Sequence, residues 1–358
     1  MDKKYILQVC AYSAPYPGNF IATLTSLAKF NYIKGYTTIF AFPETAKLYD
    51  WCNELEKTYI IYYLPLKKAR INLKTYIRIR QIYKENNIVI AHSHFELYDI
   101  PVSLMAPKEV KLYWHLHDAL ELIYKNSNII YRLIWKIQYA VCGKNVVLLS
   151  VSEKGKEFAS YLGFRSSNSF FVPNGIDINR IDQSKNGKTK NNFLIYGWDY
   201  YRKGVDILIN AVEILKDMDF ECRVVADIDV YNKISEYGYK QIRYQKPVQC
   251  VADLYSETKC FLHISRHEGL SYALLEAIYA GCIVICSDIE QNRFAKCFPN
   301  VFFVPVGDSD AVAKCMKSII LGELKISNSD IKKAKEIITN EYSLDAWLNK
   351  IQGYYFDE

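Results

Sequence analysis

The sequence of 358 residues lacks the long apolar run that a membrane-spanning helix requires. Its longest apolar runs, such as Asn145–Val151, fall far short of the ~18–20 residues that such a helix needs. The charged start Met1–Lys4 leads directly into a short segment typical of a strand. We therefore expect neither a signal peptide nor a transmembrane helix, and we expect a cytoplasmic location.

The sequence also lacks any pair of cysteines spaced as CxxC, although it contains ten cysteines; Cys282 and Cys286 come nearest. In a chain with no signal peptide this usage predicts reduced, mostly buried thiols. A composition that is 50% apolar and 23% charged excludes a disordered chain. At roughly 100–200 residues per domain, the length favours two domains.

Positive charge gathers in the first half of the chain. Residues 1–172 carry 22 Lys and Arg against 13 Asp and Glu, whereas residues 173–358 carry 23 against 26. Much of the excess lies in one acid-free run at helical spacing with apolar residues, namely Lys67, Lys68, Arg70, Lys74, Arg78, Arg80 and Lys84. This run predicts a packed helix with a solvated basic face. A helix that docks on an anionic membrane at the inner face of the plasma membrane is the alternative; no nucleic-acid partner is expected.

Short β-rich runs alternate with longer helical patterns along the whole chain. This alternation is typical of parallel sheets with helices on both faces. In the first half it predicts strands at Tyr5–Cys10, Thr37–Phe42, Tyr59–Tyr63, Ile88–Ala91, Lys111–His115 and Val146–Val151, with helices at Asn19–Lys34, Ala46–Leu55 and Asn72–Glu85. In the second half it predicts strands at Phe193–Tyr196, Glu221–Ala226, Cys260–Ile264 and Ile283–Cys286, with helices at Gly204–Lys216, Ala252–Thr258 and Tyr272–Ala280.

The pattern predicts an α/β protein of two tandem, doubly wound, Rossmann-like domains that face each other across a cleft. The turn Val172–Asp177 marks the boundary. We expect domains at 1–172 and 173–340 and a C-terminal helix at 341–358 that packs back toward the first domain. The polar stretch Asp182–Asn191 is expected to be a surface loop. In open parallel sheets ligands bind at the carboxyl ends of the strands.

The most informative segment, HEGLSYALLEA, follows the predicted strand Cys260–Ile264. Gly269 permits close approach of backbone, and Ser271 is a good helix N-cap, so the N–H groups around Leu270 suit an anion such as a diphosphate. Glu276 lies inside a helix that is apolar all round, and a buried carboxylate needs a partner. Two ribose hydroxyls of a ligand would be such a partner for Glu276. An internal Lys or Arg is the alternative.

In each of the two predicted domains, a further loop of interest follows the first strand. In the second domain, Arg202 and Lys203 stand just before a helix and suit a charged leaving group. In the first domain, Gly18 ends a strand region and begins a helix, but there is no complete GxGxxG, which argues against dinucleotide binding.

Four of the six histidines form two His-x-His pairs at strand ends: His92, His94, His115 and His117. Residues two apart on a strand share a face, so a metal site is one alternative. A His-x-His hydrolase would carry the pair after its first strand, however, and here both pairs lie in mid-domain. We therefore expect no metal. His117 is interpreted as a polar contact to substrate, with a purely structural histidine as the alternative.

Taken together, these motifs resemble the retaining family 4 glycosyltransferases of the GT-B fold, the glycosyl transferases group 1. The resemblance rests on Glu268-x7-Glu276 with the following GCIVICSD, on VPNGID at 172–177, on RKGVDILINA at 202–211, on Pro17-Gly18 and on HLHDAL at 115–120. It spans nearly the whole chain. It implies a nucleotide-sugar donor held mainly by the second domain, an acceptor held mainly by the first, and no required metal or other cofactor.

The resemblance also implies roles for single residues. Glu276 would hold the ribose hydroxyls, Glu268 would lie by the transferred sugar, and Lys203 would neutralise the diphosphate. The backbone of Gly269, Leu270 and Ser271 would bind that diphosphate, Gly18 would approach it, and His117 would contact the sugar. The implied catalytic set is therefore Glu268, His117, Lys203 and Arg202, with Gly197 completing the donor site.

Two positions depart from the family pattern. Relatives usually have Gly-Arg where this chain has Gly197-Trp198, so Arg202 is expected to replace the phosphate arginine. In this chain Glu290–Phe294 occupies the loop in which many relatives carry a glutamate near the position of Phe294. This change leaves the identity of the transferred sugar undetermined. A UDP-sugar is the first expectation and a GDP-sugar the second.

The expected reaction is retaining hexosyl transfer to a saccharide or a lipid-linked saccharide, in bacterial surface-polysaccharide synthesis. The leaving phosphate would act as base, without a covalent nucleophile. A GT-B nucleotide-sugar epimerase would not need the Glu-x7-Glu pattern, and a glycogen-type phosphorylase would need a pyridoxal lysine site and a longer chain. A non-catalytic membrane or nucleic-acid binding module would not need Glu268, Glu276 and Lys203.

Overall fold

The computed structural model describes residues 3–117, 120–182, 191–248 and 250–356. The chain divides into two compact units, one formed by residues 1–173 with the segment from Leu348 onward, the other by Asn174–Trp347. The second unit thus extends seven residues beyond the expected limit at 340. The segment 183–190, most of the expected surface loop, lies outside the described residues.

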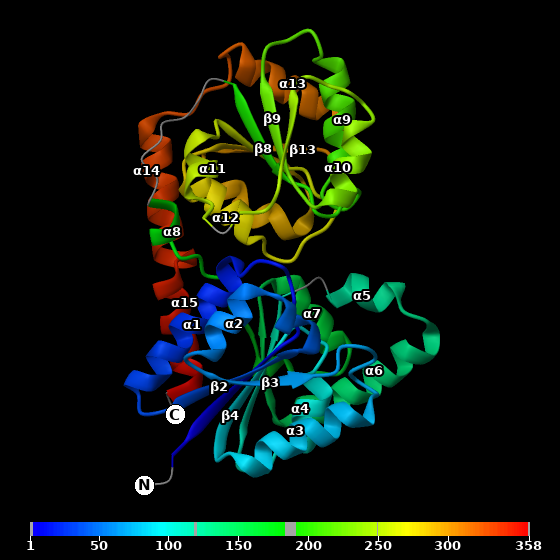
Figure 1. Cartoon of the computed structure of the whole chain (residues 1–358), viewed down its shortest axis with the longest axis vertical. Helices are drawn as coiled ribbons and strands as arrows, with labels where there is room; N and C mark the ends of the chain where they lie inside the picture. Colours follow the sequence, from blue (N-terminus) through cyan, green and yellow to red (C-terminus); the bar gives the residue numbers. More distant parts are fainter. Residues whose placement is uncertain (1–2, 118–119, 183–190, 249, 357–358) are drawn as a thin grey trace. The chain divides into compact units, whose positions relative to one another are not determined.

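The first unit is built on one parallel sheet of seven strands in the order β3-β2-β1-β4-β5-β6-β7 (Figure 1). The strands are β1 (Tyr5–Cys10), β2 (Thr37–Pro43), β3 (Ile60–Leu64), β4 (Ile88–His94), β5 (Lys111–Leu116), β6 (Val146–Ser150) and β7 (Ser169–Phe171). The helices are α1 (Gly18–Ile33), η1 (Glu44–Leu48), α2 (Asp50–Glu56), α3 (Leu73–Glu85), α4 (Asp99–Met105), α5 (Leu120–Asn126), α6 (Ile129–Cys142), η2 (Gly143–Asn145), α7 (Glu153–Tyr161) and η3 (Ser166–Asn168).

The second unit has a parallel sheet of six strands in the order β10-β9-β8-β11-β12-β13. The strands are β8 (Asn192–Tyr196), β9 (Glu221–Val225), β10 (Ile242–Gln245), β11 (Cys260–His263), β12 (Ile283–Ser287) and β13 (Val301–Val304). The helices are α8 (Asn179–Asp182), α9 (Val205–Ile214), α10 (Ile228–Ser235), α11 (Ala252–Glu257), α12 (Tyr272–Tyr279), η4 (Glu290–Cys297), α13 (Ser309–Ile320), α14 (Asn328–Ile337) and η5 (Ile338–Tyr342); α15 (Leu344–Phe356) closes the described chain.

The predicted parallel α/β class is confirmed, and most predicted strands agree with observed ones to within a residue or two. The single helix expected at Ala46–Leu55 is wrong. Tyr49 adopts an extended backbone conformation there and separates η1 from α2. Between β1 and β4, and again between β8 and β11, the strand order reverses. The carboxyl ends of those strand pairs are where open parallel sheets bind ligands.

Arg70 corrects the prediction of a wholly solvated basic run. It is 4% exposed, its guanidinium lies 4.2 Å from the centre of the Trp135 ring, and it donates hydrogen bonds to the Glu96 carbonyl. The other six cations of the run are exposed or half-buried, as predicted. Arg70 is therefore a packing residue that ties the segment before α3 to α6.

Each of the ten cysteines is a free thiol; seven are buried, Cys315 is half-buried, and Cys250 and Cys297 are exposed. Within the described parts of the chain, every helix is too short or too polar to cross a membrane.

Candidate active site

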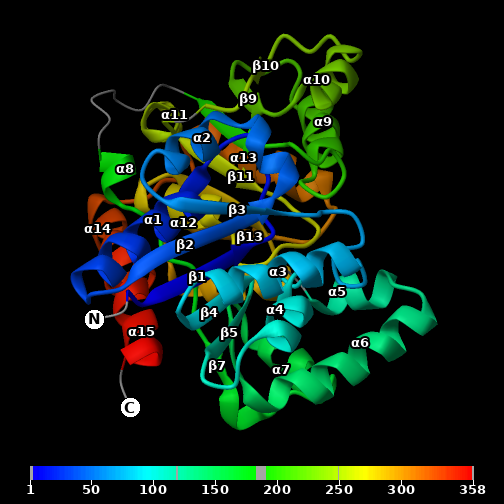
Figure 2. The ribbon, with the colours of Figure 1, turned by 60° about the horizontal axis from the view of Figure 1, so that its bottom comes forward.

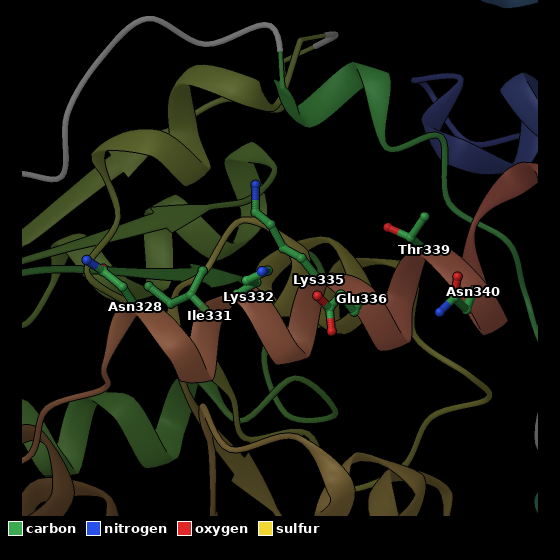
Figure 3. A pocket seen from close by; sticks show the side chains of 7 residues that line it. All are labelled: Asn328, Ile331, Lys332, Lys335, Glu336, Thr339 and Asn340. Carbon is green, nitrogen blue, oxygen red and sulfur yellow. The ribbon is translucent and has the colours of Figure 1, made fainter.

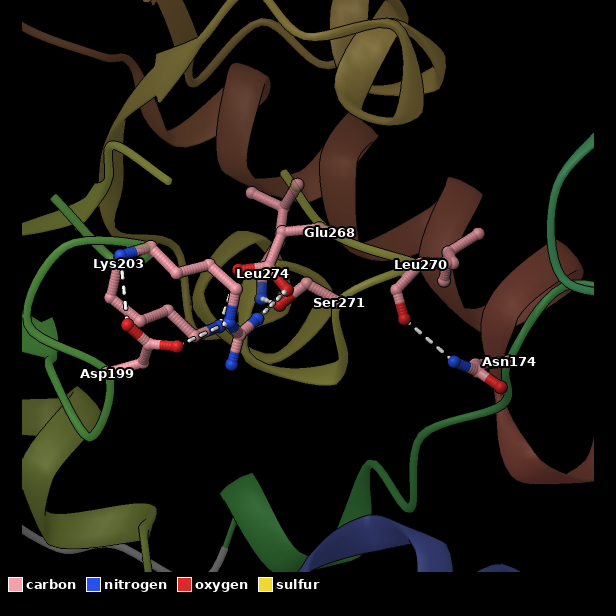
Figure 4. Close-up of polar contacts among 8 residues, drawn as sticks. Asn174, Asp199, Lys203, Glu268, Leu270, Ser271 and Leu274 are labelled. Carbon is pink, nitrogen blue, oxygen red and sulfur yellow. Dashed lines mark hydrogen bonds and ion pairs between the residues drawn. The ribbon is translucent and has the colours of Figure 1, made fainter. Parts of the chain in front are cut away.

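The candidate site of the second unit forms where the loops after β8 and β11 meet. The first loop supplies Arg202 and Lys203, and the second supplies Glu268 (Figure 4). The two strands are neighbours, and the strand order reverses between them. Residues 66 positions apart in the sequence are brought together because both follow the carboxyl end of a central strand.

Glu268 bridges the two basic side chains. Its Oε1 lies 2.5 Å from Lys203 Nζ, and its Oε2 lies 3.3 Å from Arg202 Nη1. Arg202 also donates to Asp199 through its backbone N–H and through Nε, at 3.0 and 3.2 Å. Lys203 and Glu268 are both buried, whereas the Arg202 side chain is partly exposed. Two cations are thus held side by side, one of them within reach of solvent.

Glu268 keeps its negative charge at neutral pH. Burial opposes ionisation of Glu268, but the attraction of Lys203, His263 and Arg202 outweighs burial and lowers the pKa of that carboxyl to about 2. Burial also lowers the pKa of Lys203, against the pull of Glu268. Because Glu268 is a carboxylate throughout the neutral range, it can accept hydrogen bonds and stabilise positive charge, but it cannot donate a proton.

Trp198 stands where the resembling family usually has a phosphate arginine. Lys203 Nζ lies 4.4 Å from the centre of its ring, a cation–π contact that helps to fix the ammonium group. The ring of Tyr196 stacks on Trp198 at 5.8 Å. Sequence reasoning missed both this contact and Asp199, although the spacing of Asp199 and Arg202 is that of an i, i+3 pair.

The start of α12 is held in place by two side chains. Ser271 caps the helix by accepting from the Leu274 N–H at 3.4 Å, as predicted, and Asn174 Nδ2 donates to the Leu270 carbonyl at 2.7 Å (Figure 4). Gly269 lies in the loop directly before the helix. The backbone from Gly269 to Ser271 therefore leads into a capped helix N-terminus, the kind of structure that binds anions.

Glu276 is a buried carboxylate, as its position in an apolar helix predicts. It is 6% exposed and accepts a hydrogen bond from the Tyr255 hydroxyl at 2.7 Å. Burial raises its pKa to about 7, while the Tyr255 hydrogen bond and the positive charge of Arg180 act in the opposite direction. An arginine, weighed as an alternative partner, thus contributes electrostatically, and Tyr255, for which the sequence carried no signal, donates a hydrogen bond.

Gly197 and Gly204 shape the β8–α9 loop. A Cβ at Gly197 would lie 2.7 Å from Val205 Cγ2, and one at Gly204 would lie 2.4 Å from the Ile264 carbonyl oxygen. Gly204 also has φ +74°, which side chains rarely tolerate. Gly197 is therefore a close-packing position between the loop and α9. Nearby, Arg266 forms a two-pronged ion pair with Asp206 at 2.8 and 2.7 Å.

In the first unit, Phe20 connects the start of α1, at Gly18, to His117. Gly18 begins α1 with φ +54°, and Phe20 packs edge-on against the rings of His94 and His117 at 5.4 Å. His117 is 8% exposed. Gly18 and His117 belong to one unit and Glu268 to the other, so a combined site remains a prediction.

His117 ends a chain of buried hydrogen bonds whose polarity can be followed. Gln8 Nε2 donates to the Tyr355 hydroxyl at 3.0 Å, and that hydroxyl lies 2.5 Å from His92 Nδ1. Gln8 Oε1 lies 2.8 Å from His94 Nε2, and His94 Nδ1 lies 3.1 Å from His117 Nε2. Burial lowers the pKa of His94 well below its usual value, so the ring is neutral. Its Nε2–H donates to Gln8, and Nδ1 accepts from His117.

The histidines weighed as metal ligands do cluster. His92, His94 and His115 are buried, with ring nitrogens within 4.8 Å of one another. Both nitrogens of His94 and Nδ1 of His92 take part in the hydrogen bonds just described. A metal ion at this place would have to displace part of that chain.

A shallow hollow of about 400 Å³ lies along α14 and η5, between Asn328 and Asn340 (Figure 3). Its lining comes from this one stretch of chain and does not include the strand-end residues above.

Comparisons with known proteins decide the family. Residues 36–180 match the family described as Glycosyltransferase Family 4, and residues 190–321 match the one described as Glycosyl transferases group 1. The protein is a glycosyltransferase of the family 4, group 1 type. It is 29% identical to CapH of Staphylococcus aureus, a capsular polysaccharide biosynthesis glycosyltransferase, over 67% of this chain and 70% of CapH.

Solved structures show the same fold. A glycosyltransferase from Rickettsia africae matches with a TM-score of 0.79 at 18% identity, over 99% of this chain and 98% of that one. Anabaena HepE in complex with UDP matches with a TM-score of 0.76 at 15% identity, over 98% and 99%. WaaG, a glycosyltransferase of lipopolysaccharide biosynthesis, matches with a TM-score of 0.72 at 16% identity, over 98% and 100%. The protein is a GT-B glycosyltransferase with two Rossmann-like domains.

Proposed function

We propose that this enzyme transfers a hexosyl group from a nucleotide sugar, a UDP-sugar first of all, to a saccharide or lipid-linked saccharide during surface-polysaccharide synthesis, with retention of anomeric configuration. The observation that carries the proposal is the Arg202–Lys203–Glu268 cluster at the carboxyl ends of β8 and β11. Structures of HepE with UDP and with UDP-glucose, and the likeness to CapH, support the donor class and the pathway class.

The diphosphate of a donor would form ion pairs with Arg202 and Lys203, the side chains that Glu268 contacts in this structure. Arg202 is the more accessible of the two, already oriented by Asp199, so it suits a phosphate oxygen in place of the missing family arginine. The N–H groups at the start of α12 would meet the same group. This set can stabilise a departing diphosphate without a metal ion.

In the proposed reaction the bond from the anomeric carbon to the diphosphate breaks, and the acceptor oxygen bonds to that carbon on the same face. The acceptor proton passes to an oxygen of the leaving phosphate, so charge and atoms balance without a protein base. Glu268, a carboxylate of pKa about 2, can stabilise the positive charge that develops on the sugar. His117 would form a hydrogen bond with the sugar, and Glu276 would accept hydrogen bonds from the ribose hydroxyls.

The test is transfer from UDP-, GDP- and ADP-sugars to a panel of saccharide acceptors, with the anomeric configuration of the first product read by NMR. Retained transfer from a UDP-sugar supports the proposal. An inverted product would refute the retaining mechanism, and an epimerised sugar formed in the absence of an acceptor would favour the epimerase. Lys216→Met, an exposed lysine at the end of α9, is the matched control for Lys203→Met.

A further inference from the structure

Helix α6 is apolar on two opposite sides. Trp135, Tyr139 and Cys142 face the core of the first unit. The opposite side carries six large apolar residues with exposed fractions from 40% to 79%: Ile129, Ile130, Leu133, Ile134, Ile137 and Val141. At 100° per residue these six fall within one stripe of about 140°. A stripe of this size is normally covered, because soluble proteins seldom leave contiguous large apolar patches in water.

The location of the stripe leaves it accessible within its unit. Helices α3, α4 and α6 lie on one face of the seven-stranded sheet, and α5 and α6 form the outer edge of this group (Figure 2). Arg70, stacked on Trp135, fastens α6 to the segment before α3. One side of α6 is therefore fixed to the first unit, and the opposite side, which carries the apolar stripe, is exposed within that unit.

The stretch of chain that carries the stripe is basic. From Lys125 to Ser152 the chain contains four cations, Lys125, Arg132, Lys136 and Lys144, and no Asp or Glu. The acid-free stretch from Lys67 to Lys84, which covers α3 except its last residue, Glu85, lies in the same layer and adds six exposed or half-buried cations. An apolar stripe with a basic border matches an anionic lipid surface, whose headgroups attract the cations while the acyl region receives the apolar side chains.

We propose that α6 is an interfacial membrane anchor: its Ile129–Val141 stripe inserts into the headgroup–acyl boundary of an anionic bilayer, and the basic residues of α6 and α3 hold it there. With 14 residues the helix is roughly 21 Å long, too short to span a core of ~30 Å, so it lies in the plane of the surface. A second copy of the chain fits less well, because pairing two α6 helices would bring the like charges of Arg132 and Lys136 of each copy together. The inference goes beyond the proposed reaction and does not depend on it.

The experiment is flotation of the full chain with vesicles of phosphatidylcholine alone and of equal parts phosphatidylcholine and phosphatidylglycerol. The test variant is Ile130→Gln with Leu133→Gln and Ile137→Gln. The matched control carries Ile214→Gln, Ile228→Gln and Leu321→Gln, three comparably exposed apolar residues of the second unit. Melting curves establish that each variant is folded.

We expect the native chain and the control to float with anionic vesicles only, and the α6 variant to bind at least about tenfold more weakly. Leu133→Trp should show a blue-shifted emission on binding that Ile214→Trp does not. Equal binding by native chain and α6 variant, or no binding by the native chain, would overturn the proposal. A native dimer in lipid-free sedimentation that the α6 variant abolishes, with no vesicle binding, would assign the stripe to a second copy instead.

Discussion

Glu276, one of the proposed donor contacts, has a pKa within the neutral range. Its pKa of about 7 means that the folded chain binds a proton there which the unfolded chain, at a pKa near 4.5, has released. The resulting stability is complete below pH ~4.5 and is lost as pH rises through ~7. Ribose hydroxyls that donate to the carboxylate favour its charged form.

Donor affinity should therefore increase from pH 5.5 to 8 and then level off. Calorimetry with a UDP-sugar, which has no phosphate that titrates in this range, measures this directly. Glu276→Gln should weaken binding by ~1.5–3 kcal/mol at pH 8 and flatten the pH profile. Glu213→Gln, on the exposed face of α9, is the control. A profile that is equally steep in Glu276→Gln would exclude this carboxyl as its source.

Gln8 sets the polarity of the histidine chain that ends at His117. Its amide donates to Tyr355 and accepts from His94, so no single-function side chain can replace both contacts. Gln8→Leu should lower the free energy of unfolding by ~1–3 kcal/mol. Nitrogen NMR of the native protein should find His117 protonated at Nε2, with a mixture of tautomers in Gln8→Leu. A native His117 protonated only at Nδ1 would contradict the assigned polarity.

At the scale of elements, Gly204 joins the proposed phosphate loop to α9. Gly204→Ala would force a side chain into a left-handed conformation at ~1–2 kcal/mol and would also bring a Cβ to 2.4 Å from Ile264 oxygen. Gly238→Ala is a matched control, because Gly238 has φ +65° and no neighbour within 4 Å. Gly204→Ala should lose clearly more stability in chemical denaturation than Gly238→Ala. Equal losses would mean that the close approach to Ile264, the residue after β11, carries no strain.

Most strands were predictable, because strand periodicity reflects local burial, but several helices, α6 among them, were not predicted. Glu276 illustrates how far this extends: one carboxylate in an apolar helix predicts a buried acid from sequence alone. Arg70 and Tyr255 illustrate where it ends. A basic run does not reveal which cation will stack on Trp135, about 65 positions away, and no local signal connects Tyr255 to Glu276. The exposed stripe of α6 was missed because no helix was predicted at Ile129–Cys142.

At the scale of the whole molecule, we propose that protein groups neutralise the negative charge of the leaving group. Transfer should therefore continue in EDTA at an unchanged rate, because Arg202, Lys203 and the start of α12 neutralise the diphosphate. An assay with and without added Mg²⁺, Mn²⁺ or Zn²⁺ measures this. Activity that disappears in EDTA and returns with a divalent ion would refute the assignment and would point to the cluster of His92, His94 and His115.

The central claim is that a nucleotide sugar binds to the second unit through the Lys203–Glu268 cluster. The most direct measurement is calorimetric titration of UDP-, GDP- and ADP-glucose into the native chain, Lys203→Met and Lys216→Met, all in EDTA. The account predicts binding of one donor by the native chain and by Lys216→Met, and a loss of at least ~1.5–3 kcal/mol in a folded Lys203→Met. Equal affinity of native chain and Lys203→Met, or binding of none of these donors by the native chain, would contradict it.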